Sequence, residues 1–185
     1  MSDGLFYQDT REPHIVTDVA AVTMTTTPKA MYPAGAFPIL GGNYFGRPGK
    51  KLTIGLWQKM VLGATPGNFS YDLRWGTGAD ANGTVICVTG TPIALTASVT
   101  KCGYAEFTVR CLTQGATGTL QGTGWAVWDP AIIATTLNPI LMPTAGAAAS
   151  GALDLTAANI VSVQCLQSGT AGTIQVQELT VTSRN

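Results

Sequence analysis

The chain has 185 residues, a formal net charge of zero and only 11% charged residues. Globular proteins usually contain about 25% charged residues, so we expect part of this surface to be covered by protein rather than by water. A neutral chain does not offer the basic surface that nucleic acids require, and prolines and glycines break every apolar run before the roughly 18 residues of a membrane span. We therefore expect one globular domain that binds neither nucleic acid nor membrane.

The first 14 residues are polar and include the only histidine, His14. They lack the basic and apolar regions of a secretory signal, which favours synthesis in a cytoplasm. We interpret them as an arm that becomes ordered only where a contact holds it. Residues 15–27 have high β-propensity and form a candidate strand that ends before Pro28.

Residues 31–51 are rich in proline, glycine and aromatic residues, and this composition does not allow a helix. We expect the segment to lie extended, where it either seals the edge of its own domain or contacts a neighbouring subunit. Its aromatic residues are Tyr32, Phe37, Tyr44 and Phe45.

Short strands separated by turns are predicted from residue 51 onward. The patterns at residues 51–62 and 69–75 predict a strand and its antiparallel return. Residues 84–89 are mostly apolar and could be buried on both faces, and residues 93–100 are a further strand candidate. The long Ala-, Pro- and Gly-rich segment at residues 129–151 is typical of a functional or interface loop.

Two stretches of the chain, residues 108–127 and 162–181, match at a constant offset of 54 residues. Each has alternating polarity, then Gly-x-x-Gly, then a second segment that suits a strand. A period of two is the pattern of a half-buried strand, and glycine can take the positive φ that a tight turn needs. We predict that each stretch is a β-hairpin, whether the match is a true repeat or reflects only the simple rules of hairpin sequences. Residues 51–75 resemble them more weakly.

No segment has the period and end signals of an amphipathic helix. About eight short strands with Gly and Pro turns predict an all-β fold, an antiparallel β-sandwich. The jelly roll is the closure that we expect at this length. The predicted organisation is an extended N-terminal arm with one strand, residues 1–50, followed by the sandwich domain, residues 51–185.

Few residues could carry catalysis or bind a metal. His14, in the arm, is poorly placed for a Ser–His–Asp or Cys–His arrangement, and no His and Cys cluster has zinc spacing. Residues 80–83 begin like a calcium loop but lack its final Glu, so an ordinary turn is the better interpretation. We expect no catalytic residue, no metal and no cofactor.

Three sets of residues leave alternatives open. Paired carboxylates for glycoside hydrolysis would have to come from Asp72, Asp80, Glu106, Asp129, Asp154 and Glu178. A sugar-stacking platform could come from Trp57, Trp75, Trp125 and Trp128, although the last two more often pack in a core or an interface. The four cysteines are expected to be reduced thiols, with a disulfide between Cys111 and Cys165 as the alternative.

A resemblance to a family of tailed-bacteriophage virion proteins lies in two segments, NYFGRPGKKLTIGLWQKMVLGATPGNFSYDLRWG (residues 43–76) and FTVRCLTQGATGTLQGTGW (residues 107–125). Members carry a GKKL block, a TPG turn and a strand of the L-x-CR type, which reads VRCL here, in a different residue order. The resemblance covers roughly residues 43–181. It implies a jelly-roll or sandwich protein that decorates or completes a capsid as a trimer, and it implies no catalytic residues.

We therefore expect a non-enzymatic structural protein of the virion, made in the host cytoplasm. It would bind the major capsid protein as a homo-oligomeric decoration (cement) or minor capsid protein, which agrees with the depletion of charge at interface cores. The residues expected to make contacts are Leu5, Phe6, Tyr7, Tyr32, Phe37, Tyr44 and Phe45. The alternative is a receptor- or carbohydrate-binding module of a phage tail appendage, which would use exposed Trp or Tyr side chains.

Overall fold

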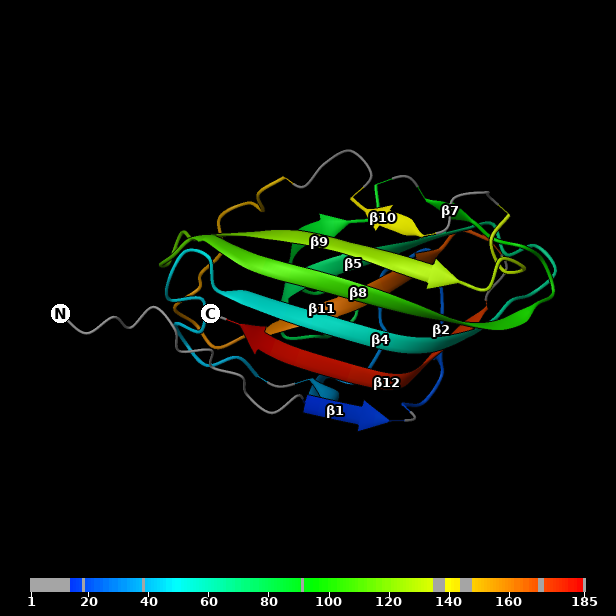
Figure 1. Ribbon diagram of the computed structural model, residues 1–185, viewed down its shortest axis with the longest axis horizontal. Helices are drawn as coiled ribbons and strands as arrows, with labels where there is room; N and C mark the ends of the chain where they lie inside the picture. Colours follow the sequence, from blue (N-terminus) through cyan, green and yellow to red (C-terminus); the bar gives the residue numbers. More distant parts are fainter. Residues whose placement is uncertain are drawn as a thin grey trace.

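Two antiparallel β-sheets face each other across one hydrophobic core, which confirms the predicted all-β sandwich (Figure 1). The structure is a computed structural model. It describes residues 14–17, 19–37, 39–90, 92–134, 139–143, 148–169 and 172–184. The jelly-roll closure and the arm stay predictions.

Sheet A is the nearer sheet in Figure 1 and has the strand order β1-β12-β4-β8-β9-β10, with β2 also paired to β12. Its strands are β1 (His14–Thr17), β2 (Val22–Thr23), β4 (Lys51–Val61), β8 (Thr100–Thr113), β9 (Thr119–Trp128), β10 (Ile140–Met142) and β12 (Thr173–Arg184).

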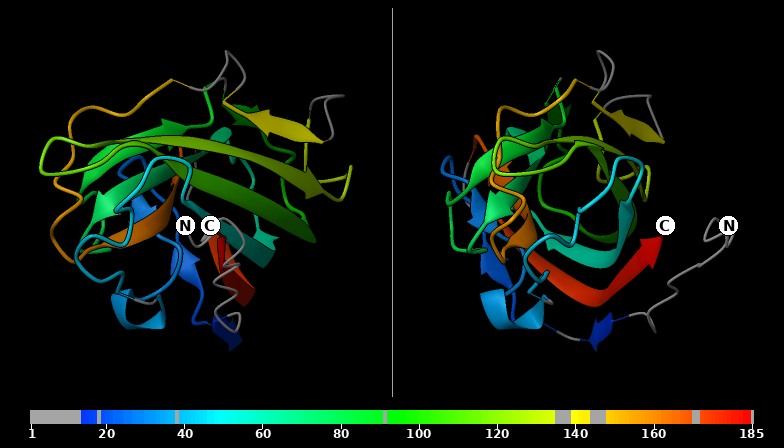
Figure 2. Two further views of the ribbon diagram at one scale, coloured as in Figure 1. Left: turned by 60° about the vertical axis from the view of Figure 1, so that its left-hand side comes forward. Right: turned by 90° about the vertical axis from the view of Figure 1, so that its left-hand side faces the viewer.

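Sheet B lies behind and has the order β3-β11-β5-β6, with β7 also paired to β5. Its strands are β3 (Lys29–Ala30), β5 (Asn68–Gly76), β6 (Thr84–Val88), β7 (Ile93–Ala94) and β11 (Ile160–Gln167). Figure 2 shows the two sheets on opposite sides of the core.

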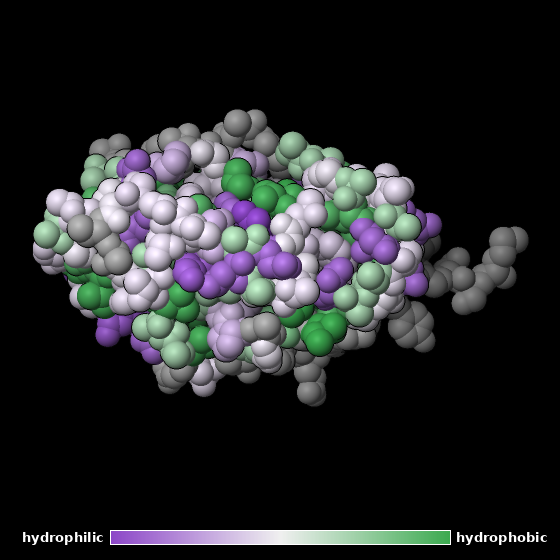
Figure 3. Space-filling view, turned by 180° about the vertical axis from the view of Figure 1, so that it is seen from behind, coloured by the Kyte–Doolittle hydropathy of each residue, from purple (hydrophilic) through white to green (hydrophobic). Residues whose placement is uncertain are grey.

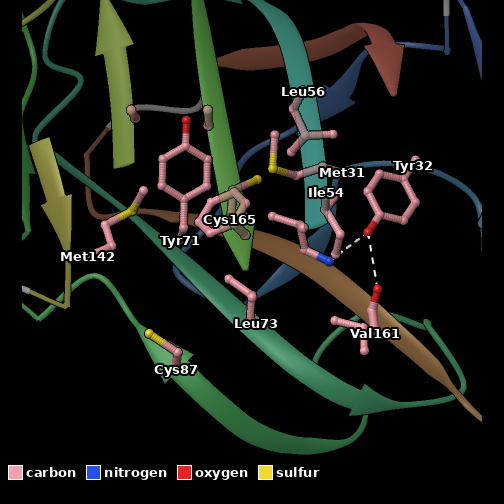
Figure 4. Close-up of a cluster of buried hydrophobic side chains, with 14 of the residues drawn as sticks. Met31, Tyr32, Ile54, Leu56, Tyr71, Leu73, Cys87, Met142, Val161 and Cys165 are labelled. Carbon is pink, nitrogen blue, oxygen red and sulfur yellow. Dashed lines mark hydrogen bonds between the residues drawn. The ribbon is translucent and has the colours of Figure 1, made fainter. Parts of the chain in front are cut away.

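The period of two that predicted strands also decides which side chains form the core. Alternate residues of β4, from Leu52 to Met60, face inward and are buried, and those of β8 do so from Gly103 to Cys111. Phe107 of sheet A packs against Tyr71 of sheet B with ring centroids 5.3 Å apart, and Ile54 and Leu56 belong to the same buried cluster (Figure 4). Burying side chains of this size is the main favourable term in folding.

The first of the two matching stretches forms the predicted hairpin. β8 and β9 pair directly, and the register runs from Gly103 opposite Trp128 to Thr113 opposite Thr119. Gly115 has a φ of 98° in the turn between them, a value that glycine adopts without steric cost. This prediction is confirmed.

The second stretch does not form a hairpin, so that prediction was wrong. β11 pairs with β5 and β3 in sheet B, whereas β12 pairs with β4, β1 and β2 in sheet A. The connection therefore crosses the sandwich. The two strands lie in different sheets because their burial differs. β11 is buried on both faces and completes sheet B, while β12 alternates in burial as a strand of sheet A.

The segment from β4 to β5 crosses the sandwich in the same way, so its predicted antiparallel return was also wrong. The two crossings lie side by side, because β12 pairs with β4 and β11 pairs with β5. Their loops touch: the Gln167 Nε2 donates to the Pro66 carbonyl at 2.9 Å, and the Gly169 N–H donates to the same oxygen at 3.1 Å. A Cβ on Gly169 would lie only 2.1 Å from the Thr65 carbonyl oxygen.

The described residues before β4 pack on the sandwich and supply three short strands rather than one. The candidate strand at 15–27 is divided into β1 and β2, and both lie along β12 at the edge of sheet A. β3 adds to β11 at the edge of sheet B. The edges of both sheets on this side are thus formed by the N-terminal segment.

The opposite side of the sandwich is closed by β6 and β9. Gly122 of β9 lies against Cys87 of β6, and a Cβ on Gly122 would come within 2.6 Å of the Cys87 Cβ. β6 is an edge strand with Val85 and Val88 exposed, which corrects the expectation that it could be buried on both faces. Within the described residues, no helix is long and apolar enough to cross a membrane.

Candidate binding face on sheet A

Three aromatic side chains lie together on the outer face of sheet A, the face toward the viewer in Figure 1. Trp57 of β4, Tyr104 of β8 and Trp125 of β9 stand on neighbouring strands. The Trp57 and Tyr104 ring centroids are 5.1 Å apart, and those of Tyr104 and Trp125 are 5.4 Å apart. The ring planes are tilted by 52° and 54°. Trp57 is 51% exposed.

Tyr104 can lie across the sheet because Gly55, its diagonal neighbour in β4, has no side chain. A Cβ on Gly55 would be 2.7 Å from the Tyr104 hydroxyl oxygen. Glu106 of β8 is opposite Gly55 in the register, and Thr180 of β12 is opposite it on the other side. The Tyr104 hydroxyl therefore reaches over β4 toward polar groups on both neighbouring strands.

Two carboxylates flank the Tyr104 hydroxyl. Tyr104 donates to Glu106 Oε2 at 3.3 Å, and Thr180 donates to Glu178 Oε1 at 3.3 Å. Partial burial, followed by the charge and hydrogen bond of Glu106 and the charge of Glu178, raises the pKa of Tyr104. Tyr104 therefore stays protonated and keeps donating its hydrogen bond.

A β-bulge in β12 brings Glu178 to this face. Val176 pairs with Gln58 and Glu178 pairs with Trp57, so Gln177 is an extra residue in β12. Gln177 and Glu178 are both half-buried, whereas Val176 is fully buried. Bulges often redirect side chains beside functional sites, and this one places two adjacent polar side chains next to Trp57.

A shallow hollow of about 770 Å³ lies between these rings and the start of the loop after β9. Its rim includes Cys102, whose Sγ lies 3.6 Å from the Gln177 Oε1, and Asp129, which pairs with Lys101 at 3.1 Å. We call Trp57, Tyr104, Glu106, Trp125 and Glu178 the aromatic face.

Apolar side chains continue the aromatic face toward the edge of the sheet. Val127 of β9 is 38% exposed, and Leu141 of β10, opposite Trp125 in the register, is 65% exposed. Figure 3 shows the opposite side of the molecule, where hydrophilic and hydrophobic residues are mixed. A connected set of exposed apolar side chains is a better indicator of binding than single ones.

The residues predicted to make contacts do not lie on this face. Tyr32, Phe37 and Phe45 are at most 3% exposed and belong to the core, and Tyr44 packs against it. The Tyr32 hydroxyl accepts from the Val163 N–H at 2.8 Å (Figure 4). Tyr32, Phe37 and Phe45 therefore seal their own domain, and a contact of this segment with a neighbouring subunit stays a prediction. Leu5, Phe6 and Tyr7 lie outside the described residues.

The four tryptophans divide into two pairs. Trp75 and Trp128 are 5% and 2% exposed and pack in the core, whereas Trp57 and Trp125 belong to the aromatic face. Of the six carboxylates considered for catalysis, Glu106 and Glu178 come to this one face.

The turn at residues 77–83 is closed by its own side chains. The Asn82 Oδ1 accepts from the Thr77 N–H at 3.2 Å, and Asp80 pairs with Lys29 at 2.8 Å. This agrees with an ordinary turn rather than a calcium loop.

All four cysteines are free thiols. Cys111 and Cys165 belong to strands of different sheets, and both are at most 1% exposed. Within the described residues, no three His, Cys, Asp or Glu side chains gather where they could hold a metal ion.

No protein-family model and no curated protein matches the chain. The phage resemblance therefore rests on the sequence segments quoted above and stays a prediction.

Sequence reasoning missed Tyr104, and it considered Glu106 and Glu178 only as two of six candidate carboxylates for glycoside hydrolysis. A signal was present for the first two, because Ala105, Phe107 and Val109 alternate with them as inward residues. The signal for Glu178 was weaker, because the bulge breaks the alternation of β12 at Gln177.

Proposed function

We propose that this chain is a non-enzymatic structural protein of a phage particle that attaches to the capsid as a decoration or minor capsid protein. The observation that supports this proposal best is the aromatic face. Trp and Tyr are enriched among the residues that dominate protein binding energy. Three such rings lie together on the outer face, Trp57 exposed and Tyr104 and Trp125 partly exposed, in a chain with only 11% charged residues. In this proposal the aromatic face is the contact with the capsid.

The same proposal includes self-association, with a trimer as the expected oligomer. Oligomers with closed symmetry repeat one surface around an axis. A trimer would present three aromatic faces to a lattice of equivalent sites, so modest contacts would combine through avidity.

The test is attachment to capsids assembled without this protein. Purified protein is mixed with such capsids, the particles are sedimented, and bound protein is quantified. Trp57→Ala and Trp125→Ala should each lower occupancy several-fold. Val88→Ala, on exposed strand β6 of sheet B, is the matched control and should bind like the wild type. Wild-type occupancy by both Trp variants would show that the aromatic face is not the contact, and failure of the wild type to bind would refute the proposal.

The predicted contribution of the arm is tested separately. Removal of residues 1–13, which precede β1, should weaken attachment and leave the sandwich folded, as judged by an unchanged unfolding transition. Equal occupancy of the truncated and full-length proteins would exclude Leu5, Phe6 and Tyr7 as contacts.

A second candidate is a carbohydrate-binding module of a tail appendage. The specific observation in its favour is that Trp57 and Trp125 flank Tyr104 on an open sheet face, where sugar rings could stack. A glycan array should then give hits that are lost in Trp57→Ala and Trp125→Ala. Labelling of the protein on intact particles separates the two candidates, since a shell location favours the first and a tail-tip location the second.

A further inference from the structure

The two carboxylates of the aromatic face are not paired with cations of the described chain. Glu106 and Glu178 each accept a hydrogen bond only from a neutral hydroxyl, of Tyr104 and Thr180 respectively. Other carboxylates of the described chain do have cationic partners, as Asp80 has Lys29, Asp72 has Arg74 and Asp129 has Lys101. Within the described chain, neither carboxylate of the aromatic face forms an ion pair with a lysine or an arginine.

The aromatic rings add to this negative potential. The face of an aromatic ring carries a partial negative charge, and a cation within about 6 Å of the ring centroid is attracted to it. The Trp57 and Trp125 rings lie 5.1 Å and 5.4 Å from the Tyr104 ring, and both carboxylates act on Tyr104. A cation above Tyr104 would thus meet aromatic rings and carboxylates together.

Two local features of the backbone assemble this arrangement. Gly55 leaves the space into which the Tyr104 hydroxyl extends, and the bulge at Gln177 turns Glu178 to the same side. The bulge also serves the core, because it puts Leu179 and Val181 on the buried side of β12.

From this charge complementarity we propose that the aromatic face binds an arginine side chain of a protein partner. A guanidinium group is planar, stacks on aromatic rings and donates paired hydrogen bonds to carboxylates, whereas an ammonium group is a compact, strongly hydrated charge. A neutral sugar would stack on the rings but would cover two carboxylates without balancing their charge, which is costly. The inference rests on the proposed function, since it states which group of the partner the aromatic face recognises.

The experiment compares two peptides that differ only in charge. A short arginine-containing peptide and its citrulline counterpart, which has the same shape but no charge, are titrated into the full chain while tryptophan fluorescence is recorded. We expect the arginine peptide to bind with a Kd at least about tenfold lower, because charged hydrogen bonds and the cation–π contact are both lost in citrulline. Added salt should weaken the binding of the arginine peptide more than that of citrulline.

Variants assign the preference to the aromatic face. Glu106→Gln combined with Glu178→Gln should remove the tenfold preference, and Trp57→Ala should weaken binding of the arginine peptide. Asp80→Asn, which removes a negative charge from the turn after β5, is the matched control and should keep the preference. A change in unfolding midpoint would identify any variant that loses binding through misfolding.

The proposal is overturned if the citrulline peptide or a neutral saccharide binds as tightly as the arginine peptide, or if the double Gln variant keeps the preference. Failure of this inference is separable from failure of the proposed function. Capsid attachment that is lost in Trp57→Ala but intact in the double Gln variant would keep the function and exclude the arginine. Arginine preference without any capsid attachment would support the inference and refute the function.

Discussion

At the scale of single residues, the core contains a buried polar cluster centred on the Tyr71 hydroxyl. The hydroxyl of Tyr71 accepts a hydrogen bond from Gln58 Nε2 and also bonds the Trp128 side chain, and both Gln58 and Tyr71 are fully buried. The Gln58 Oε1 is buried with no hydrogen-bond partner. Burial is the main cause that raises the Tyr71 pKa far above its ordinary value, so the hydroxyl is neutral.

Tyr71→Phe should therefore destabilise the protein by about 1–3 kcal/mol, the cost of leaving buried polar groups without partners. The measurement is the free energy of unfolding in urea. Tyr104→Phe is the control, because its 3.3 Å bond to Glu106 lies on the outer face and its loss should cost less. Equal losses in the two variants would contradict this account of the core.

The thiols provide a second prediction at this scale. Cys102 is exposed, whereas burial raises the pKa of Cys87 to about 11 and that of Cys165 to about 12, and it also raises the pKa of Cys111. Thiolates are the reactive form. At about pH 8 a thiol reagent should modify one cysteine rapidly in the native protein and all four after unfolding. Rapid modification of two or more native thiols, located by mass spectrometry, would show that the sandwich opens.

At the scale of elements, alternation identifies strands but does not say which strands pair. It was sufficient for β4, β8 and β9, since inward positions such as Ile54 and Phe107 recur every second residue. It could not distinguish a hairpin from a crossing, because both contain two strands and a glycine turn. What sets the β11–β12 crossing apart from a hairpin is its long-range hydrogen bonds, such as that from Gln167 to the Pro66 carbonyl. The candidate site was hard to predict for a similar reason. The bulge at Gln177 breaks the alternation of β12 and moves Glu178 to the outer face, which a pattern of period two does not predict.

Gly169→Ala tests the contact between the two crossings. The new Cβ would lie 2.1 Å from the Thr65 carbonyl oxygen, and backbone atoms cannot easily move away. We expect a loss of about 1–3 kcal/mol or more in the free energy of unfolding, as for other overpacked sites. Gly41→Ala, where nothing lies within 4 Å of the new Cβ, should have a much smaller effect. Similar stability of the two variants would mean that the crossings do not touch.

The ion pair between Lys29 and Asp80 joins β3 to the turn after β5, and it predicts a pH dependence. The hydrogen bond from Lys29 lowers the pKa of Asp80 below the ordinary value of an aspartate. A lowered folded-state pKa means that the contribution to stability is present above about pH 4 and is lost as the pH falls through the folded-state pKa. The pair is largely exposed, so the contribution is small.

Asp80→Asn should accordingly be less stable than the wild type at about pH 7, and the difference should shrink at about pH 2, as the pH falls through the lowered folded-state pKa of Asp80. Unfolding curves at both pH values provide the check. A difference that stays constant between them would mean that the Asp80 charge has no role.

At the scale of the whole molecule, the sequence was sufficient for the fold class but not for the location of the site. Composition and turn spacing indicated a sandwich, and the structure has one. The arm aromatics were expected at an interface, yet Phe45 is fully buried. An aromatic residue in an irregular segment carries no periodic signal, so its burial depends on tertiary packing alone. The aromatic face depends in turn on four strands from distant parts of the chain.

Self-association is the prediction at this scale. Sedimentation equilibrium should give a mass three times that of the 19.2 kDa chain, since the scarcity of charge suits surface that is covered by other copies. Circular dichroism should show strand and little helix in the same sample. A stable monomer at high concentration would contradict the oligomer and weaken the proposed role on a lattice.

The position of β12 has a consequence for synthesis on the ribosome. This last strand lies between β1 and β4, so the N-terminal edge of sheet A has no neighbour until residues 173–184 have been made. Until then, the backbone groups of β1 and β4 that pair with β12 remain open to water or to other chains. Nascent chains that stall before residue 173 should be sensitive to protease and should require chaperones.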